Sequence, residues 1–381
     1  MFIDTGWSSL PKFGEELCGD NVEVVKTDDS VVAVLADGLG SGVKANILSK
    51  MTVKIIATML EKGATLEEVV ETIGDTLPIC QIRHVAYSTF TIIQAKKNGE
   101  IYIVEFDNPS TFFLHGGQVA AVPFRETEIF GKKIKETRFQ AAMGDILVAV
   151  SDGIIHAGIG GVLNLGWQWE NVADYLQRMP KPILNAKSVS KRLLSVSDEL
   201  YAGHPGDDAT VMVLQIRDPR TVTIAVGPPK SKEDDQILIE KLQAENGKKV
   251  ICGGTTGTIV ARYFQQEISV DIREMDSEVP PIGVLPGIDL VTEGIITLSK
   301  TLEYLEKSHL SGDIPAKHNG AADLTKILLE SDEIRFLVGR AINPAHQNPD
   351  LPLNLGLKLQ VVTEISNILA QIGKQVTIQY L

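Results

Sequence analysis

Three acidic motifs lie far apart in the chain, and each adjoins an apolar, strand-like segment. They are Asp37-Gly38 in the run ADGLGSG, Asp152-Gly153 in VAVSDGI and Asp207-Asp208 in GDDATVMV. A carboxylate at a strand end beside glycine can face a cleft while its backbone stays rigid. Several such carboxylates at one point repel one another unless cations neutralise them, and oxygen-bound divalent metals are the usual solution. The motifs therefore predict a two-metal hydrolase.

A single Asp-Gly pair is weak evidence, because this pair is common in turns. Three acidic motifs at strand ends in one stretch of chain are harder to explain in that way. The glycines Gly38, Gly40 and Gly42 precede a predicted helix, whose backbone NH groups could approach an anion closely. Asp20, in CGDN just before the first predicted strand, is a fourth candidate acid at the same edge.

Two histidines and one cysteine lie close to these motifs. His204, in AGHPGDD, and with less weight His156, could protonate the leaving oxygen of a substrate as general acid. The alternative for both is a surface or capping histidine. Cys18 lies beside Asp20 and could be sensitive to oxidation, whereas the alternative for it is a small buried residue.

Apolar periodicity predicts the elements that must position these groups. The segments 22–25 and 31–36 read as strands, and apolar residues recur every four positions from Ile47 to Met59, which predicts a helix over 43–61. Further elements are predicted before residue 217: strands at 87–94, 100–106, 111–115, 145–151 and 209–216, and helices at 167–178 and 185–202.

A second helix is predicted to start near Thr65, because Thr65 with Glu68 has the form of a capping box. After RDPR at 217–220 the pattern changes to alternating strands and helices, which predicts a separate domain with a mostly parallel sheet. The expected domains are therefore 1–218 and 219–381. The predicted elements of the second are helices at 233–245, from 257, at 295–307, 321–330 and 358–372, and strands at 248–252, 333–338 and the C-terminus.

The second domain carries one local feature that could bind an anion. Gly253-Gly254-Thr255-Thr256-Gly257 joins a predicted strand to a helix, and its NH groups and hydroxyls could hold a phosphate or carboxylate. The alternative is a tight turn. Two other loops, 280–294 with Asp289 and Glu293, and 343–353 with His346, would gather at the same edge of a parallel sheet. We expect either a small-ligand sensor that regulates the first domain or a structural domain for dimerisation or target binding.

Composition narrows the class of protein. The 381 residues are 44% hydrophobic and 22% charged with a net charge of −13, and the longest basic cluster is KKIK at 132–135. Nucleic-acid and anionic-membrane binding are therefore not expected. Cys18, Cys80 and Cys252 are isolated, which fits a reducing compartment. With no signal-peptide pattern and no run of about 18 apolar residues, a cytoplasmic location is expected.

The acidic motifs, in their order and spacing, resemble the metal-dependent protein phosphatases of the PP2C type, in the branch of SpoIIE, RsbU and RsbX. The resemblance covers residues 1–216. It rests on Lys12-Phe13-Gly14-Glu15, Cys18-Gly19-Asp20, the DG-x-G-x-G-x-x-A signature at 37–45, Ser88-Thr89-Phe90-Thr91, Asp107-Asn108-Pro109, Gly144-Asp145 with Ser151-Asp152-Gly153, and Asp207-Asp208-Ala209-Thr210-Val211.

The resemblance implies an α+β fold, an αββα sandwich with a metal centre at one end, followed by the smaller α/β domain. It implies that Asp37 bridges two Mg²⁺ or Mn²⁺ ions and that the Gly38 carbonyl binds one of them. Asp152 and Asp207 would complete the shell of the second ion, with support from Asp20. Asp208 carries lower weight, because its role varies among relatives. Gly153 is expected to serve the tight turn.

The implied activity is hydrolysis of a phosphoserine or phosphothreonine by a metal-activated water, on a regulatory protein such as a small STAS-domain protein. Relatives use helices like those at 43–61 and 65–76 for regulation and dimer contacts, so a homodimer is also considered. Two other functions stay open: a non-catalytic regulatory scaffold, and a hydrolase of a small phosphorylated ligand. The complete set Asp20, Asp37, Asp152 and Asp207 argues against the scaffold.

The chain departs from the family pattern in two ways. Eukaryotic relatives bind the substrate phosphate with an arginine near the N-terminus, whereas the first arginine here is Arg83. That role is therefore absent or filled otherwise, with Lys12 as a candidate. Most relatives also carry sensor or membrane domains before the phosphatase, whereas the extra domain here follows it.

Overall fold

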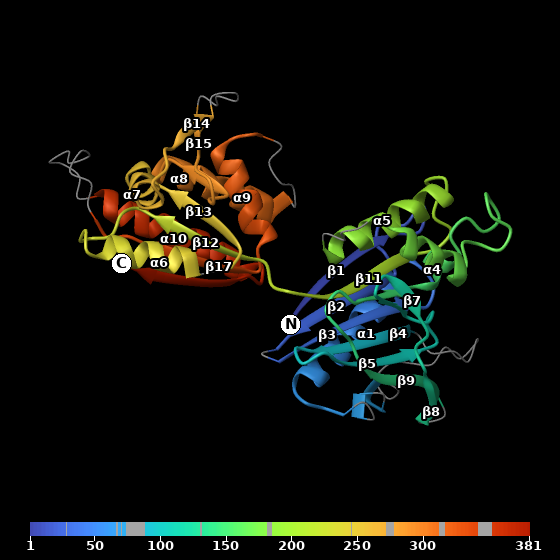
Figure 1. The fold of residues 1–381 in the computed structure, drawn as a ribbon. Coiled ribbons are helices and arrows are strands. Elements are labelled where there is room, and N and C mark those ends of the chain that lie inside the picture. The colour runs from blue at the N-terminus through green and yellow to red at the C-terminus, as the bar shows by residue number, and fades with distance from the viewer. Residues whose placement is uncertain are drawn as a thin grey trace. The chain divides into compact units, whose positions relative to one another are not determined.

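The computed structural model divides into two compact units, Met1–Asp218 and Pro219–Leu381 (Figure 1). The structure describes residues 1–27, 29–65, 68–69, 71–73, 88–129, 132–180, 185–244, 246–271, 278–311, 317–341 and 353–381.

The first unit contains two antiparallel sheets. The six-stranded sheet has the order β2-β3-β4-β5-β9-β8, and the five-stranded sheet has the order β1-β11-β10-β6-β7. The strands of the first sheet are β2 (Asp20–Lys26), β3 (Ser30–Gly38), β4 (Ser88–Lys96), β5 (Glu100–Phe106), β8 (Arg125–Ile129) and β9 (Lys132–Gln140). Those of the second are β1 (Phe2–Leu10), β6 (Phe112–His115), β7 (Gln118–Ala120), β10 (Ile146–Val150) and β11 (Ala209–Arg217).

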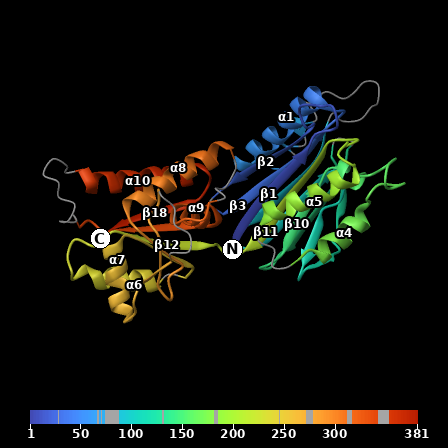
Figure 2. The ribbon, with the colours of Figure 1, turned by 90° about the horizontal axis from the view of Figure 1, so that it is seen from above.

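Three buried clusters hold four layers together. In the middle cluster, Leu35 and Ile93 of one sheet pack with Leu147 and Leu214 of the other. The outer face of the six-stranded sheet packs against α1 (Gly42–Glu61), which Figure 2 shows over β2 and β3. The outer face of the five-stranded sheet packs against α4 (Trp169–Arg178) and α5 (Ala186–Leu200). The predicted αββα sandwich is therefore confirmed.

Several strands of this unit were not expected from the sequence. The strand β1 carries small and polar residues rather than an apolar stripe, because it lies close against α5. An added Cβ at Gly6 would collide with the backbone of Lys187, and the Ser8 hydroxyl lies 3.0 Å from that of Ser190. The strands β7, β8 and β9 were also missed; β8 and β9 form a hairpin rich in charged residues at a sheet edge.

The predicted capping box is present after α1. The Thr65 backbone NH donates to Glu68 Oε2 at 2.7 Å, and the Glu68 NH donates to Thr65 Oγ1 at 3.3 Å. The helix that it starts is described only in part. The predicted strand residue 87 and Arg83 lie outside the described residues.

The second unit is a seven-stranded sheet with helices on both faces. The sheet order is β14-β15-β16-β13-β12-β17-β18, and the last five strands are parallel to one another. The strands are β12 (Thr221–Val226), β13 (Lys248–Cys252), β14 (Ser269–Asp271), β15 (Ile282–Val284), β16 (Leu290–Thr292), β17 (Glu333–Val338) and β18 (Gln375–Tyr380). The predicted α/β unit with a mostly parallel sheet is confirmed.

The helices of this unit cover the two faces of the sheet unequally. They are α6 (Asp234–Ala244), α7 (Gly254–Phe264), α8 (Ile295–Ser311), α9 (Gly320–Glu330) and α10 (Leu353–Gln371). The helices α8, α9 and α10 pack on one face, and α6 and α7 on the other (Figure 2). The sequence placed a junction at TVTIAV, but this segment is the central strand β12. The predicted loop 280–294 likewise contains β15 and β16.

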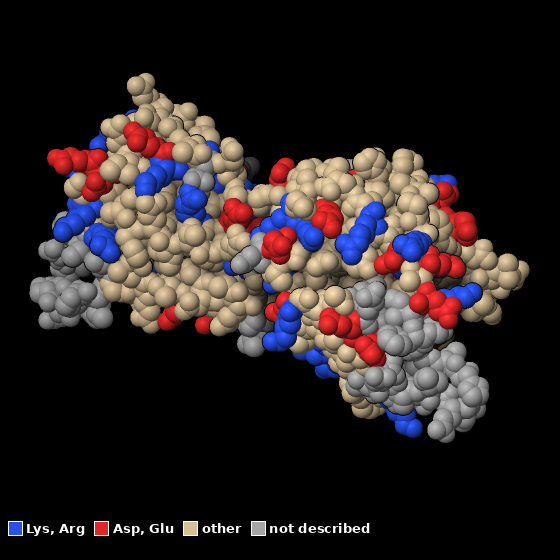
Figure 3. Space-filling view, turned by 90° about the horizontal axis from the view of Figure 1, so that it is seen from below, with Lys and Arg blue, Asp and Glu red and all other residues tan. Residues whose placement is uncertain are grey.

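None of the helices that the structure describes is long and apolar enough to cross a membrane. On the face drawn in Figure 3, lysine and arginine side chains are interspersed with aspartate and glutamate side chains.

Candidate active site

The acidic motifs of the first unit meet where several strands end. Asp20 starts β2 and lies directly opposite Asp37 near the end of β3. Asp152 follows β10 and starts the short helix α3 (Asp152–Ile155), while Asp207 and Asp208 immediately precede β11. Because β10 and β11 pair with Val150 opposite Val211, Asp152 lies beside the Asp207-Asp208 pair. The two sheets thus each contribute carboxylates to the same end of the sandwich.

The Asp20 carboxyl group is buried, and the Asp37 carboxyl group opposite it is half-buried. Burial raises the pKa of both groups, and the neighbouring aspartates raise it further. For Asp37 those neighbours are Asp20, Asp152 and Asp207, which shows that carboxylates from three separate segments face one another. The hydroxyls of Ser151 and Thr210 lower the pKa of Asp20 in part, but neither is in hydrogen-bonding geometry.

Asp152, Asp207 and Asp208 form the other part of the cluster. Burial raises the pKa of Asp152, while His156 lowers it; burial and then Asp152 raise the pKa of Asp207. Asp208 is held by backbone groups. Its Oδ1 accepts a hydrogen bond of 3.0 Å from the Lys12 NH, and its own NH donates to Asp207 Oδ1 at 3.0 Å.

The donor set fits divalent cations. Both Oδ atoms of Asp20 and Oδ2 of Asp208 are buried without a hydrogen-bond partner. An unpaired buried carboxylate oxygen is costly, and an all-oxygen set is what Mg²⁺ and Mn²⁺ prefer. Among the described residues no three acidic, histidine or cysteine side chains are yet arranged to hold an ion.

Two glycines of the acidic motifs are required by close backbone packing. An added Cβ at Gly38 would collide with the Ala45 carbonyl in the first turn of α1. At Gly153 it would collide with the Asp208 carbonyl. Glycine therefore lets the Asp37 segment lie against α1 and lets the Asp152 turn lie against the Asp208 strand end.

Two supporting residues hold the ends of the strands in place. The Tyr201 hydroxyl, which the sequence analysis missed, donates to the Gly153 carbonyl at 2.7 Å in a buried position. Asn108, noted only as part of a motif, donates from Nδ2 to Thr91 Oγ1 at 2.8 Å and to the Val150 carbonyl at 3.2 Å. Asn108 thus connects the two sheets. The position of Tyr201 at the end of α5, shortly before the GDD motif, is the signal that could have identified it.

The candidate histidines are both exposed. The His204 ring packs on Phe13 with centroids 4.4 Å apart, and its Nδ1 lies 3.0 Å from the Ala202 carbonyl. Because a carbonyl oxygen only accepts, Nδ1 carries the hydrogen of this contact, and Nε2 is the ring nitrogen left to exchange a proton with a substrate. His156 follows α3; its backbone NH donates to the Asp152 carbonyl at 2.9 Å, and its charge lowers the pKa of Asp152.

Cys18 and Lys12 have different surroundings in the structure. Burial, followed by the charge of Asp20, raises the pKa of the Cys18 thiol to about 12. This thiol therefore stays protonated, as expected for a small, largely buried residue. Lys12 lies at the acidic edge through its backbone contact with Asp208, and its charge lowers the pKa of Asp207. It is therefore near the place where a substrate phosphate would bind.

The C-terminal candidates divide into three groups. The 253–257 segment spans the start of α7, at the carboxyl end of β13. Asp289 instead closes a turn, since its Oδ2 accepts from the Lys249 NH at 2.8 Å. Glu293 follows β16, and His346 lies outside the described residues.

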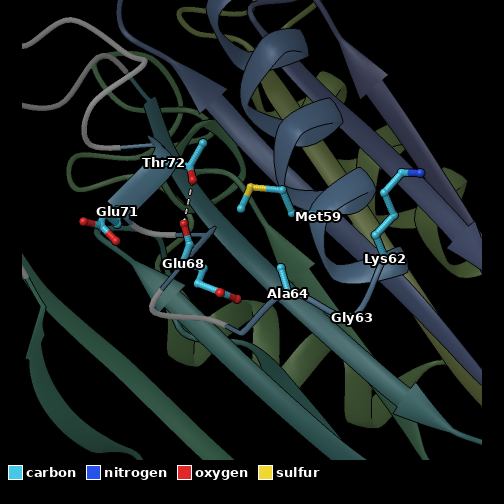
Figure 4. Close-up of a pocket in the computed structure, with 7 residues that line it drawn as sticks. All are labelled: Met59, Lys62, Gly63, Ala64, Glu68, Glu71 and Thr72. Atoms are coloured by element: carbon cyan, nitrogen blue, oxygen red, sulfur yellow. Dashed lines mark hydrogen bonds between the residues drawn. The ribbon is translucent and has the colours of Figure 1, made fainter.

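A surface cavity of about 620 Å³ lies elsewhere, at the C-terminal end of α1. Figure 4 shows the side chains of Met59, Lys62, Glu68, Glu71 and Thr72 around it. None of the candidate aspartates lines this cavity. Since α1 has 20 residues and a helix rises about 1.5 Å per residue, the cavity and Gly38 lie at opposite ends of the helix.

Two face-to-face antiparallel sheets enclosed by helices are the architecture of PP2C-type phosphatase domains. The family model described as Stage II sporulation protein E (SpoIIE) matches residues 27–217, which is half of the chain. The chain belongs to this SpoIIE family, of the PP2C-type serine/threonine phosphatases.

A curated relative matches a part of the chain of similar length. Stage II sporulation protein E of Bacillus subtilis is 24% identical over 223 residues, which are 56% of this chain and 26% of that protein. The chain therefore spans about a quarter of the length of this curated relative.

Solved structures give weaker likenesses. The PP2C phosphatase domain of SpoIIE from Bacillus subtilis, with a fragment of its regulatory domain, is 21% identical with a TM-score of 0.49, covering 57% of this chain and 64% of that chain. The RsbU and RsbW domains of a Mycobacterium tuberculosis protein are 18% identical with a TM-score of 0.45, covering 64% and 67%.

Proposed function

We propose that the first unit is a divalent-metal-dependent phosphatase that hydrolyses phosphoserine or phosphothreonine on a regulatory protein. Asp20, Asp37, Asp152 and Asp207 would hold two Mn²⁺ or Mg²⁺ ions, with Asp208 and the Gly38 carbonyl as further ligands. One observation carries the proposal: buried carboxylates from both sheets raise one another's pKa, and some of their oxygens have no partner. A fold gains nothing from such a cluster unless cations bind to it.

When bound, the ions would neutralise the carboxylates, activate a water and stabilise charge on the phosphoryl oxygens. The chain supplies the rest. Gly38 and Gly153 let the Asp37 and Asp152 segments approach α1 and β11, and Tyr201 fixes the Gly153 turn. The Lys12 side chain is the candidate to attract a phosphate group at this acidic edge. His204 stays a lower-weight candidate to donate a proton to the departing serine oxygen.

Family membership supports a regulatory-protein substrate, with a small STAS-domain protein as the first candidate. Fold and family alone do not fix a substrate, so the site has to be tested with several phosphate compounds. A metal centre at the end of a sandwich can accept a phosphorylated loop of a folded protein as well as a small phosphoester.

The test is hydrolysis of p-nitrophenyl phosphate and of a phosphoserine peptide, with Mn²⁺ or with EDTA. Asp37→Asn is compared with Asp174→Asn, which changes an exposed aspartate on α4 that pairs with Arg178 at 2.7 Å. We expect metal-dependent turnover in the wild type and in Asp174→Asn, and none in Asp37→Asn.

The other outcomes select the alternatives. If the protein turned over no substrate with any metal, and if calorimetry showed no metal binding that Asp37→Asn removes, the non-catalytic scaffold would be the remaining function. Metal-dependent turnover of small phosphoesters without any turnover of phosphoproteins would indicate the hydrolase of a small phosphorylated ligand.

A further inference from the structure

The parallel strands of the second unit follow the order of a doubly wound nucleotide-binding sheet. In chain order β12, β13, β16, β17 and β18 are the first to fifth parallel strands, and they lie side by side as 3-2-1-4-5. The order therefore reverses between β12 and β17, where the connecting helices also change face. In sheets of this kind ligands bind outside the carboxyl ends of the strands at this reversal.

The strand ends at this edge are bare backbone. Gly227 follows β12, Gly253 follows β13 and Gly339 follows β17 directly in the sequence. They extend the parallel ladder, because the Gly227 NH donates to the Cys252 carbonyl at 3.1 Å and the Gly339 NH to the Val226 carbonyl at 3.0 Å. Of these three, the backbone at Gly253 is the most open to a ligand, whereas the Cβ positions of Gly227 and Gly339 are filled by Lys358 and by the Pro228 carbonyl.

A lysine reaches the same point from α10. The Lys358 ammonium donates to the Gly339 carbonyl, and an added Cβ at Gly227 would lie 2.7 Å from its Nζ. Lys358 is partly buried, and burial lowers its pKa. It forms no ion pair with an acidic residue in the described part of the chain. A desolvated cation without a counter-charge at the reversal point is suited to bind an anion.

The adjacent strand end adds a helix N-terminus with an unused hydroxyl. The helix α7 begins directly after Gly253, and Thr256 lies in its first turn. The Thr256 side chain is 0% exposed and its Oγ1 has no hydrogen-bond partner. An added Cβ at Gly253 would lie 3.3 Å from this Oγ1 and 3.7 Å from the Gly227 nitrogen, so the hydroxyl lies close to Gly253 at the end of β13, next to the end of β12. A helix N-terminus with a free donor is a phosphate-binding arrangement.

One carboxylate lies further along the same edge. Glu293 follows β16, and its Oε2 is buried without a partner. A carboxylate repels phosphate but accepts hydrogen bonds from hydroxyl groups. Since neighbouring strands lie about 4.8 Å apart, Glu293 is roughly 10–15 Å from Lys358 across the ends of β16, β13 and β12. This span suits a ligand with phosphate at one end and hydroxyls at the other.

We propose that the carboxyl edge of this sheet binds a phosphorylated, hydroxyl-bearing small molecule of nucleotide size. Lys358 and the N-terminus of α7 with Thr256 would contact the phosphate, and Glu293 would accept from the sugar hydroxyls. The strand end at Gly253 would form the floor beneath it, beside Gly227 and Gly339, which contact Lys358.

The experiment is calorimetric titration of the full-length protein in EDTA with ADP, inorganic phosphate and adenosine. EDTA prevents metal-mediated phosphate binding at the first unit, and Asp37→Asn should give the same curves. We expect ADP to bind more tightly than phosphate, and adenosine to bind least. Lys358→Met should weaken ADP binding about tenfold or more, as loss of one charged hydrogen bond to phosphate does. Thr256→Val should weaken ADP binding several-fold.

Lys326→Met, at an exposed lysine of α9, is the matched control and should bind ADP like the wild type. Glu293→Gln should weaken the binding of ADP and leave the affinity for inorganic phosphate unchanged. The proposal is overturned if the folded protein binds neither ADP nor phosphate at millimolar concentration. It is also overturned if Lys358→Met and Lys358→Arg both bind ADP as tightly as the wild type.

Discussion

The two units carry opposite chemistry at the ends of their strands. In the first unit, Asp20 and Asp37 are buried carboxylates that burial and neighbouring acids make harder to ionise. In the second, Lys358 is a partly buried cation whose pKa burial lowers, beside the unpaired Thr256 hydroxyl. Each edge thus holds groups that the unit itself does not satisfy. The sign of the uncompensated charge indicates the kind of ligand that would bind: cations at the first edge and an anion at the second.

The largest test of this comparison removes one carboxylate from the acidic edge. Asp152→Asn should lower the metal-dependent phosphatase rate about a thousandfold, the scale of losing a principal electrostatic contact in an active site. In EDTA the same change should raise the unfolding temperature, because one repelling charge is gone. Steady-state kinetics with Mn²⁺ and thermal unfolding in EDTA measure the two effects.

A variant that lost activity and also lost stability in EDTA would show that Asp152 is a structural group of the fold. The control is Asp174→Asn, which should change neither quantity. Wild-type activity in Asp152→Asn would remove this residue from the proposed metal set.

A second test asks whether each edge responds only to its own kind of ligand. Mn²⁺ at a hundredfold excess over its dissociation constant should stabilise the first unit by about 2.7 kcal/mol. Hydrogen exchange should slow in β2, β3 and β11 and stay unchanged in β12 and β17. Asp37→Asn is the control that should abolish the slowing. Equal protection of both units by Mn²⁺ would contradict the assignment of cations to the acidic edge alone.

Local patterns predicted most of the fold of both units. The helix over 43–61 was identifiable because its apolar residues recur every four positions, and α1 spans Gly42–Glu61. The strand β1 was missed because its contact with α5 selects the small residues Gly6 and Ser8 in place of large apolar ones. The central strand β12 was missed because Arg-Asp-Pro-Arg before it and Gly-Pro-Pro after it read as a junction.

The candidate site could be predicted in its residue types but not in its supports. The acidic motifs are local in sequence, and the turn glycines Gly38 and Gly153 accompany them. Tyr201 and Asn108 act through contacts between distant segments, which no local pattern encodes. The anion edge of the second unit was visible only as the 253–257 turn, because Lys358 is separated from it by most of the domain. The metal roles of the aspartates stay predictions.

A third test sharpens the contrast through backbone packing. Gly153→Ala adds a Cβ that would collide with the Asp208 carbonyl, so the Asp152 turn and the start of β11 must separate. We expect a loss of about 1–3 kcal/mol in the free energy of unfolding, as overpacking causes, together with a lower phosphatase rate. In Gly161→Ala the nearest neighbour of the added Cβ would be the Gly158 carbonyl at 3.6 Å, so this variant should change neither the stability nor the rate.

Denaturant unfolding and kinetics with Mn²⁺ measure both consequences. At the other edge, Gly254→Ala meets no atom within 4 Å and should be tolerated, although Gly254 starts α7. If Gly153→Ala were as stable and active as Gly161→Ala, the close packing of the two acidic segments would not matter for the site.

The smallest effect expected is that of the hydrogen bond that fixes the Asp152 turn. Tyr201→Phe removes the buried donor to the Gly153 carbonyl and leaves the ring in place. The free energy of unfolding should fall by about 1 kcal/mol, the net value of one such bond and of the carbonyl left unpaired. A purely structural role would end there. Because Gly153 directly follows Asp152, we also expect weaker Mn²⁺ binding in calorimetry and a lower rate at subsaturating metal, with the rate restored at high Mn²⁺.

Tyr175→Phe, at a partly buried tyrosine of α4 packed beside Trp167, is the matched control and should leave Mn²⁺ affinity unchanged. Unchanged Mn²⁺ affinity in Tyr201→Phe would assign Tyr201 to the stability of the sandwich alone, and the acidic edge would then be held by its strands without help from α5.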